Sequence, residues 1–398
     1  IKTALTAMAY RDGKAAPALL KALADDSPLR RATAVDVLCQ NGLAEPRDVL
    51  RKLLTDPKPT VQLRAALALA QVRDASAVDA LIRLLGELPA AQGRFAEEYL
   101  SNLAAEQSPK EPLTDDASRA KVRDAWAAWW KSTEGTAGLD EFTRRTLNEL
   151  DREKAEKLIR QLGDNDFDAR QRAKTELRGM GVLVIRMLKA AVNDPDFEVS
   201  QGSRYVLQEI EKDKAAPLSP VTARVVALRK PPGAVPVMLA YLPFCDDEGL
   251  LGDVQAALNA VAYAGGKPDP ALLKALDDKA AVRRGAAAEA LCLGPLGDDL
   301  PAVKKLLKDP EPSVRLQAAL ALAGGPHDRD AVPVLIALVG ELNGEPGEQA
   351  EEYLVRLAAD HGPLNLPAGD AARGKRSELW AAWWKDNGDR VALVDRYA

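Results

Sequence analysis

The amino-acid sequence predicts an all-α protein, a right-handed solenoid of about ten stacked helix pairs. Three observations lead to this fold class. Alanine and leucine supply most of the apolar content, while aromatic residues make up only 5% of the 398 residues, a composition that favours helices over strands. A unit of two apolar helices recurs at a spacing of about 30 residues. In addition, a long stretch of the chain occurs twice with its spacing nearly intact.

Nearly identical segments mark this duplication. RKLLTDPKPTVQLRAALALA at 51–70 returns as KKLLKDPEPSVRLQAALALA at 304–323. WAAWWK at 126–131 returns at 380–385. The repeats divide the chain into a module that ends in a tryptophan helix, a central block of further helix pairs, and a duplicate of the first module: 1–131, 132–253 and 254–398.

The smaller unit consists of an apolar helix, an aspartate-containing turn and a second apolar helix. Aspartate before a helix accepts bonds from unpaired backbone N–H groups and complements the positive end of the helix dipole. Proline in the first turn costs no hydrogen bond, because that N–H has no intrahelical partner. Val61, Ala65, Leu67 and Leu69 form an apolar stripe that only a stacked neighbour can bury. The clearest units cover 25–38, 55–69, 163–177, 193–207, 277–291 and 308–322.

This unit resembles the HEAT repeat, including the subgroup called PBS-lyase HEAT-like repeats. The motif D-P-x-x-x-V-R, followed by x-x-A-A-x-A-L, fits best at 309–322. Gln62 and Ser200 stand where the motif has arginine. The resemblance covers most of the chain, and it implies an armadillo-like superhelix that serves as a protein-binding scaffold.

A narrower resemblance concerns large uncharacterised repeat proteins of planctomycete bacteria. It is carried by QLGDNDFDARQRAKTEL at 161–177, by LRKPPGAVPVMLAYLPF at 228–244 and by the closing WAAWWK. Such solenoids often accompany further domains, β-propellers among them. The resemblance therefore implies a bacterial source and a multidomain context.

The start of the chain predicts that this is a fragment of a larger multidomain protein. The first residues, IKTALTAMAY, have no initiator methionine and no signal-peptide pattern, and they begin inside a helical segment of the duplication. The apolar stretches are too short and too interrupted to cross a bilayer, which predicts a soluble protein. Cytoplasm and periplasm both stay open as its compartment, and so does peripheral membrane association.

Charge and residue usage argue against nucleic-acid binding and catalysis. The net charge is −5, without the basic stripe that nucleic-acid binders show. Cys39, Cys245 and Cys292 form no CxxC, and His327 and His361 have no partners at metal-ligand spacing. No P-loop, GxGxxG, GxSxG or HExxH occurs. We therefore predict a non-enzymatic protein without catalytic, cofactor-binding or metal-binding residues.

The two tryptophan clusters are the most distinctive feature of the sequence. In each cluster the three indoles stand at i, i+3 and i+4, which places them on about one face of a helix. Two interpretations stay open: a buried cap at the apolar end of each module, which we favour, or an exposed anchor for a partner. The residues concerned are Trp126, Trp129, Trp130, Trp380, Trp383 and Trp384.

Arginines recur on the second helices of the units, which we expect to line a concave groove. We favour a structural ladder in which they pair with turn aspartates, while any that stay unpaired would bind an acidic protein partner. The candidates for partner binding are Arg64, Arg204, Arg284 and Arg315. The partner itself is not identifiable from sequence.

Three alternatives to a protein-binding scaffold stay open. The first is a solenoid arm of a membrane-coat-like or envelope-associated assembly, which the planctomycete resemblance suggests. The second is an enzyme similar to the bilin lyases that share this repeat, although no chromophore pocket is specified. The third is a nucleic-acid-binding solenoid of the DNA-glycosylase type, against which the acidic balance argues.

Overall fold

The fold is all-α, as the sequence predicts. The computed structural model describes residues 10–11, 14–39, 47–212, 218–245 and 247–393. Over these residues, nearly all of the regular structure is helical, and the strands form two short antiparallel hairpins. No described helix is long and apolar enough to cross a membrane.

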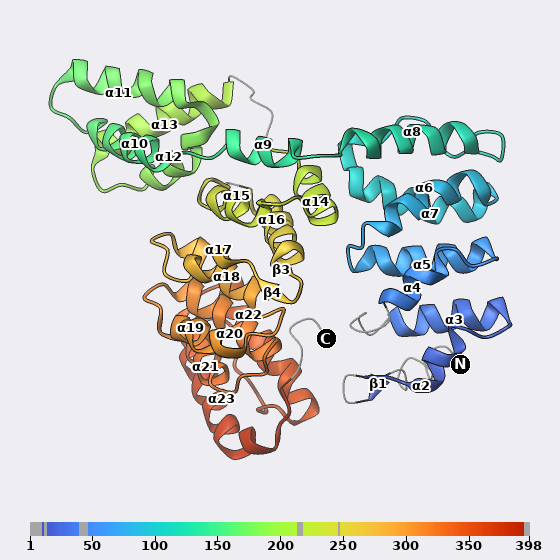
Figure 1. The fold of residues 1–398 in the computed structure, drawn as a ribbon. Helices are drawn as coiled ribbons and strands as arrows, with labels where there is room; N and C mark the ends of the chain where they lie inside the picture. Colours follow the sequence, from blue (N-terminus) through green and yellow to red (C-terminus); the bar gives the residue numbers. More distant parts are fainter. Residues whose placement is uncertain (1–9, 12–13, 40–46, 213–217, 246, 394–398) are drawn as a thin grey trace. The chain divides into compact units, whose positions relative to one another are not determined.

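The chain forms two compact units, each described here by itself (Figure 1). Unit 1 comprises residues 1–138 and 221–231. Its helices follow one another as stacked antiparallel pairs, and they are joined by a helix from much later in the chain, α14. The elements are β1 (Tyr10–Arg11), β2 (Lys14–Ala15), α2 (Pro17–Ala22), α3 (Pro28–Cys39), α4 (Arg47–Leu53), α5 (Pro59–Gln71), α6 (Ser76–Glu87), α7 (Ala90–Ala104), η1 (Ala105–Gln107), α8 (Arg119–Ser132) and α14 (Pro220–Arg229).

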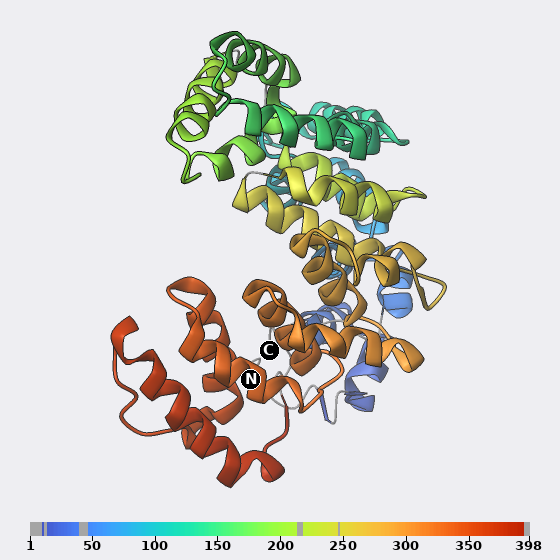
Figure 2. The same ribbon diagram turned by 90° about the vertical axis from the view of Figure 1, so that its left-hand side faces the viewer.

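Unit 2 comprises residues 139–220 and 232–398. Its first part contains α9 (Ala137–Arg144), α10 (Glu149–Gln161), α11 (Phe167–Met180), η2 (Gly181–Val184), α12 (Ile185–Ala191), α13 (Phe197–Lys212), α15 (Ala234–Tyr241), η3 (Leu242–Phe244) and α16 (Glu248–Val261). Its second part, orange to red in Figure 2, contains β3 (Tyr263–Ala264), β4 (Lys267–Pro268), α17 (Pro270–Ala275), α18 (Ala281–Leu291), η4 (Gly297–Asp299), α19 (Leu300–Lys305), η5 (Leu306–Lys308), α20 (Pro312–Gly324), α21 (Ala331–Glu341), α22 (Glu345–Ala358), η6 (Ala359–His361), η7 (Asp370–Ala372), α23 (Arg373–Asn387) and η8 (Gly388–Arg390).

The duplicated sequence forms the same elements twice. The hairpin β1–β2 has its counterpart in β3–β4, with Tyr10 opposite Ala15 and Tyr263 opposite Pro268. The helices α5 and α20 both begin with proline at the first helical position, where the absent N–H costs nothing. Both modules end in the tryptophan helix, α8 or α23.

Each module has an alanine- and leucine-rich core. In α5 the side chains of Val61, Ala65 and Leu69 are completely buried between the neighbouring helices, whereas Leu67 is only half-buried. Small alanine side chains let these helices approach closely, and the leucines fill the remaining space. This packing shows why one pair is not stable alone, since its apolar stripe needs the next pair to cover it.

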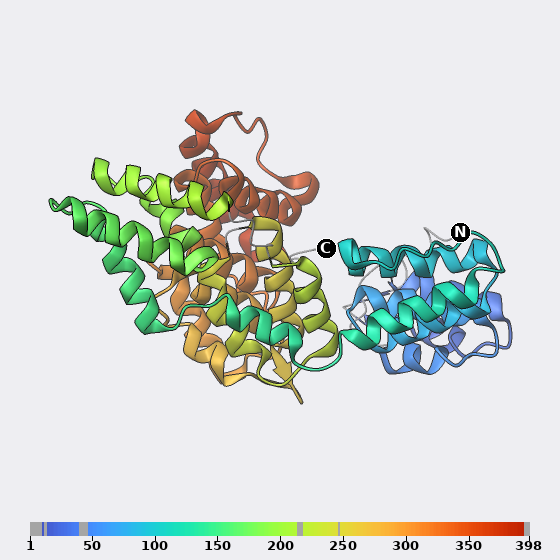
Figure 3. The same ribbon diagram turned by 90° about the horizontal axis from the view of Figure 1, so that it is seen from above.

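The second helices of the central pairs, α11 and α13, are less completely buried than α5 and α20. The second helices α11 and α13 pack against each other, and the first helices α10 and α12 do the same (Figure 3, green). On α13, Val199, Val206 and Ile210 point into the core. The opposite side of this helix is exposed to solvent. The division into three sequence parts with boundaries at 131 and 253 stays a prediction.

Candidate functional site

The turn between the two helices of each unit is closed by an aspartate. Its carboxylate accepts a hydrogen bond from the backbone N–H two residues later, as an N-terminal cap does. The donor is Ser27 for Asp25, at 2.8 Å, and Glu311 for Asp309, at 2.9 Å. The same bond is made within other units by Asp56, Asp164, Asp194 and Asp278. Asp74 and Asp328 make it in the connections that follow α5 and α20.

A side chain six residues after the turn aspartate then bonds the carbonyl oxygen of that aspartate. Four units use arginine for this bond, with Nη1–O distances of 2.6 to 2.9 Å: Arg31, Arg170, Arg284 and Arg315. Gln62 does the same to Asp56 through its amide. Ser200, in the corresponding place on α13, bonds the carbonyl of Val192 at 2.7 Å instead. The arginine of the HEAT-like motif thus stabilises the turn of its own unit.

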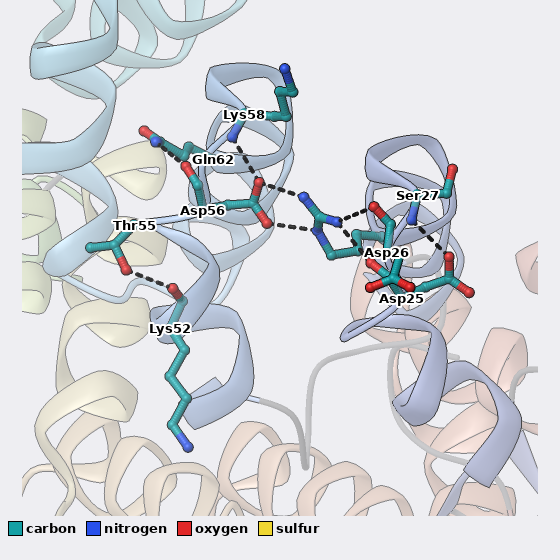
Figure 4. A network of polar contacts seen from close by, with 9 residues as sticks. Asp25, Asp26, Ser27, Lys52, Thr55, Asp56, Lys58 and Gln62 are labelled. Atoms are coloured by element: carbon teal, nitrogen blue, oxygen red, sulfur yellow. Dashed lines mark hydrogen bonds and ion pairs between the residues drawn. The ribbon is translucent and has the colours of Figure 1, made fainter.

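Two of these arginines also reach the turn aspartate of the following unit. Arg31 binds both carboxylate oxygens of Asp56 at 2.7 and 2.8 Å, and Arg284 binds both of Asp309 at 2.7 Å. Figure 4 shows the turns of the first pair, with Asp25 and Asp26 on one side and Asp56 on the other. At these two places, one in each module, a unit is therefore tied to the next by a bidentate ion pair.

Burial and these bonds act in opposite directions on the aspartates. Desolvation raises the pKa of Asp56 and Asp309, but the guanidinium and the backbone N–H at each carboxylate outweigh it, so that both pKa values lie below the ordinary value. The two side chains of the Arg284–Asp309 pair are only 12% and 5% exposed. Arg284, a candidate for partner binding, is thus engaged within the repeat.

The other three candidate arginines differ in how far they are engaged. Arg315 binds both carboxylate oxygens of Glu341 at 2.5 and 2.6 Å and is mostly buried. Arg64 is half-exposed, with Asp36 at 3.7 Å. Arg204 is exposed on α13, and its guanidinium makes no hydrogen bond or ion pair with any residue that the structure describes. Among the four, Arg204 is the one without a hydrogen bond or ion pair to a described residue.

The tryptophan clusters lie largely inside their modules. Trp126 and Trp380 are each 1% exposed. Five of the six tryptophans are buried, and Trp384 is partly exposed. The first two rings of each cluster meet edge to face, with centroids 5.5 Å apart on α8 and 5.7 Å apart on α23. Such aromatic pairs stabilise beyond their buried area.

Polar and cationic groups complete the two clusters differently. The indole of Trp130 donates to Asp79 at 2.9 Å, and the guanidinium of Arg229 on α14 lies 3.4 Å from its ring centroid. Trp383 donates to the carbonyl of His361 at 2.6 Å. The guanidinium of Arg329 lies 5.1 Å from the ring centroid of Trp384. The first cluster is covered by α14, whereas one edge of the second is open.

The sequence analysis did not single out Tyr205, which lies beside Arg204 on the exposed side of α13. Its ring is 52% exposed, and the ammonium of Lys174 on α11 lies 5.4 Å from the ring centroid. Gln201 and Gln208 lie one turn to either side and are also exposed. We call these four residues of α13 the α13 face. An aromatic residue directly after an arginine in the second helix of a unit was the sequence signal that could have indicated it.

No described part of the chain assembles a metal site, and the thiol of Cys39 is not activated. Among the residues placed in the structure, no three histidine, cysteine, aspartate or glutamate side chains could together hold a metal ion. Burial, aided by the negative charge of Asp36, raises the pKa of the Cys39 thiol to about 12. A thiol with that pKa stays protonated near neutral pH and is a poor nucleophile.

Comparison with known families agrees with the geometry of the turns. A model of HEAT repeats matches residues 16–101, and a model of the HEAT repeat matches residues 300–324. The chain therefore contains HEAT repeats in both of these stretches. HEAT repeats typically form scaffolds for protein interaction and are generally not enzymes. None of these matches bears on the planctomycete resemblance, which stays a prediction.

Two further comparisons add little to the HEAT assignment. A search of curated proteins gave no match. Among solved structures, this HEAT-repeat chain is similar to the crystal structure of an engineered protein from the Northeast Structural Genomics Consortium. The two are 19% identical, the match covers 92% of this chain and 98% of that one, and the TM-score is 0.22.

Proposed function

We propose that this HEAT-repeat chain is a non-enzymatic scaffold whose α13 face contacts a protein partner. One observation carries the proposal: Arg204 and Tyr205 are adjacent, exposed and needed by no turn of the repeat. Arginine and tyrosine are among the residues that contribute most to protein interfaces. The α13 face places them between two amide side chains, which can bond a partner's backbone or polar groups.

The arginines of the repeat turns support this choice by contrast. Arg31, Arg284 and Arg315 are fixed by carboxylates and carbonyls of the scaffold itself. Arg204 lies on a second helix too, but no such group engages it among the described residues. Its charge is therefore available to a carboxylate of the partner, and we expect an acidic group at this point of the interface.

The test compares partner capture by the wild-type chain with capture by three variants, two of which reverse a charge. Arg204→Glu should abolish recovery of the partner from an extract of the source organism, and Tyr205→Ala should weaken it. Lys157→Glu makes the same charge change on the exposed side of the first helix α10 and should leave recovery unchanged. All variants should retain the wild-type circular dichroism spectrum.

Two outcomes would contradict the proposal. Unchanged recovery with Arg204→Glu removes α13 from the interface. Equal loss with Arg204→Glu and Lys157→Glu shows dependence on net charge alone and not on the α13 face.

A further inference from the structure

The two central units carry an exposed phenylalanine at a position where other units have proline. Phe167 is the first residue of α11 and is 60% exposed; Phe197 is the first residue of α13 and is 69% exposed. The corresponding helices α3, α5 and α20 begin with proline. A large apolar ring left in water at an equivalent point of two adjacent repeats indicates a contact surface.

The turns that carry these rings lie against each other. A methyl group placed on Gly163, in the first turn, would lie 2.9 Å from Oδ2 of Asp196 and 2.8 Å from Cγ2 of Val199, in the second. Glycine thus lets the two turns approach this closely without displacing those side chains. Arg170 of the first turn also has its Nε 3.8 Å from Oε2 of Glu198. The two phenylalanines therefore belong to one continuous edge of unit 2.

This edge is strongly acidic. The first turn has carboxylates at Asp164, Asp166 and Asp168, and the second has Asp194, Asp196 and Glu198. Arg170 is the one cation within the stretches 164–170 and 194–200, and Arg172, just beyond the first stretch, has its Nη2 3.8 Å from Oδ2 of Asp166. We call Phe167, Phe197, Asp166, Asp168, Asp196 and Glu198 the turn edge. An acidic surface of this kind repels phosphate groups and attracts basic ones.

The two halves of the turn edge differ in one respect. In the first half, the guanidinium of Arg170 lies 5.7 Å from the ring centroid of Phe167, within the range of a cation–π contact. In the second half, Ser200 stands at the position of Arg170 and bonds the carbonyl of Val192. The scaffold thus supplies a cation to the first ring and only a short hydroxyl at the corresponding place beside the second.

We propose that the turn edge binds an arginine-bearing basic segment of a protein partner, with a guanidinium over Phe197 and paired with Asp196 and Glu198. The arrangement of Arg170 over Phe167 is the intramolecular version of this contact. The inference rests on the scaffold function proposed above, and it adds the chemistry of one partner segment. That segment contacts a surface next to, and distinct from, the α13 face.

The experiment measures fluorescence anisotropy of labelled synthetic peptides added to the full chain. The probe is Gly-Arg-Gly-Leu-Arg-Gly-Arg-Gly, and the comparison peptide has glutamate in place of each arginine. The arginine peptide should bind, in a salt-dependent manner, and the glutamate peptide should not. Phe197→Ala and Glu198→Gln should each weaken binding by about ten-fold, the effect of a lost cation–π contact or a lost charge-assisted bond.

Ser200→Arg gives the sharpest form of the test. It restores the arginine found at this position in four other units, so the turn should remain intact and the melting temperature should not fall. The new guanidinium should occupy the face of Phe197 and weaken peptide binding by about ten-fold. If Ser200 had only a structural role, the substitution would not weaken peptide binding while leaving the melting temperature unchanged.

The controls separate a specific site from general attraction to an acidic protein. Phe95→Ala removes another exposed ring, 54% exposed on α7, and Glu153→Gln removes an exposed charge on α10; neither should change the affinity. The proposal is overturned if Phe197→Ala and Ser200→Arg leave the affinity unchanged, or if both controls weaken it equally. Should Arg204→Glu abolish partner capture in that case, the scaffold function stands and only the turn edge fails.

Discussion

The two duplicated modules share their apolar framework but differ in the polar groups that complete it. Their tryptophan rings meet at nearly the same angles, 86° between the first two indoles on α8 and 84° on α23. The ladder pairs Arg31–Asp56 and Arg284–Asp309 have the same bidentate geometry. Packing and turn chemistry were therefore retained together, since each unit needs both to hold its neighbour.

The polar partners of the indoles have diverged. Trp380 donates to Glu351 at 3.1 Å, and Trp383 donates to His361. The buried indole nitrogens of Trp126 and Trp129 have no hydrogen-bond partner among the described residues. Glu97, which corresponds to Glu351, instead accepts from the backbone N–H of Leu113 at 2.9 Å. A copied core can thus survive with different polar bonds around the same rings.

The largest effect should come from the rings that both modules bury completely. Trp126→Ala and Trp380→Ala should each lower the free energy of unfolding of their unit by about 3–5 kcal/mol, because each leaves a large cavity. Denaturant unfolding followed by circular dichroism measures this loss. Leu364→Ala, at a side chain that is 84% exposed, should change little. A loss in one module without a similar loss in the other would show that the two surroundings are not equivalent.

A smaller effect is expected from the ladder aspartates. Asp56→Ala and Asp309→Ala should each cost about 2 kcal/mol, the contribution of hydrogen bonds to a charged group. Because the folded-state pKa of Asp309 lies below its unfolded value of about 4, the stability it contributes is complete above that pH. It is lost as the pH falls through the lowered pKa.

Melting temperatures between pH 7 and pH 3 test this pH dependence. Asp309→Asn cannot gain or lose a charge, so its melting temperature should fall less steeply below pH 4 than that of the wild-type chain. Parallel acid profiles for the two proteins would mean that Asp309 has the same pKa in the folded and unfolded states.

Much of the fold could be predicted because its determinants are local and repeated. Aspartate at the turn and arginine six residues later recur in the sequence, and each residue performs its role within one turn. The exposed aromatics are different, because phenylalanine is a typical core residue and the sequence does not show whether Phe167 and Phe197 are buried. The stacking of α10 to α13 shows that both rings are exposed. The sequence also lacks a signal that α14 packs with unit 1, because that contact joins distant parts of the chain.

The smallest expected effect concerns an arginine that lies on different helices in the two modules, next to the last turn of the ladder. In the second module, Arg315 on α20 binds Glu341 on α21. In the first module, Gln62 stands in place of Arg315, and Arg83 on α6 supplies the guanidinium instead, bonding Gln62 at 2.9 Å and Glu87 at 2.8 Å. Ala337 occupies the position of Arg83 in the second module. The cation has therefore changed helices while its carboxylate partner has stayed.

This exchange predicts compensation between two substitutions. Gln62→Arg alone brings two guanidinium groups together, and Arg83→Ala alone leaves the amide oxygen of Gln62 and the carbonyl of Leu54 without their donor. Each single change should cost about 1 kcal/mol, since the groups are only partly buried. The double variant recreates the arrangement of Arg315 and Glu341 and should return close to wild-type stability. Urea unfolding of the four proteins gives the coupling energy, which we expect to be about 2 kcal/mol. If the loss in the double variant equals the sum of the two single losses, positions 62 and 83 are not coupled, and the arginine of one module does not replace that of the other.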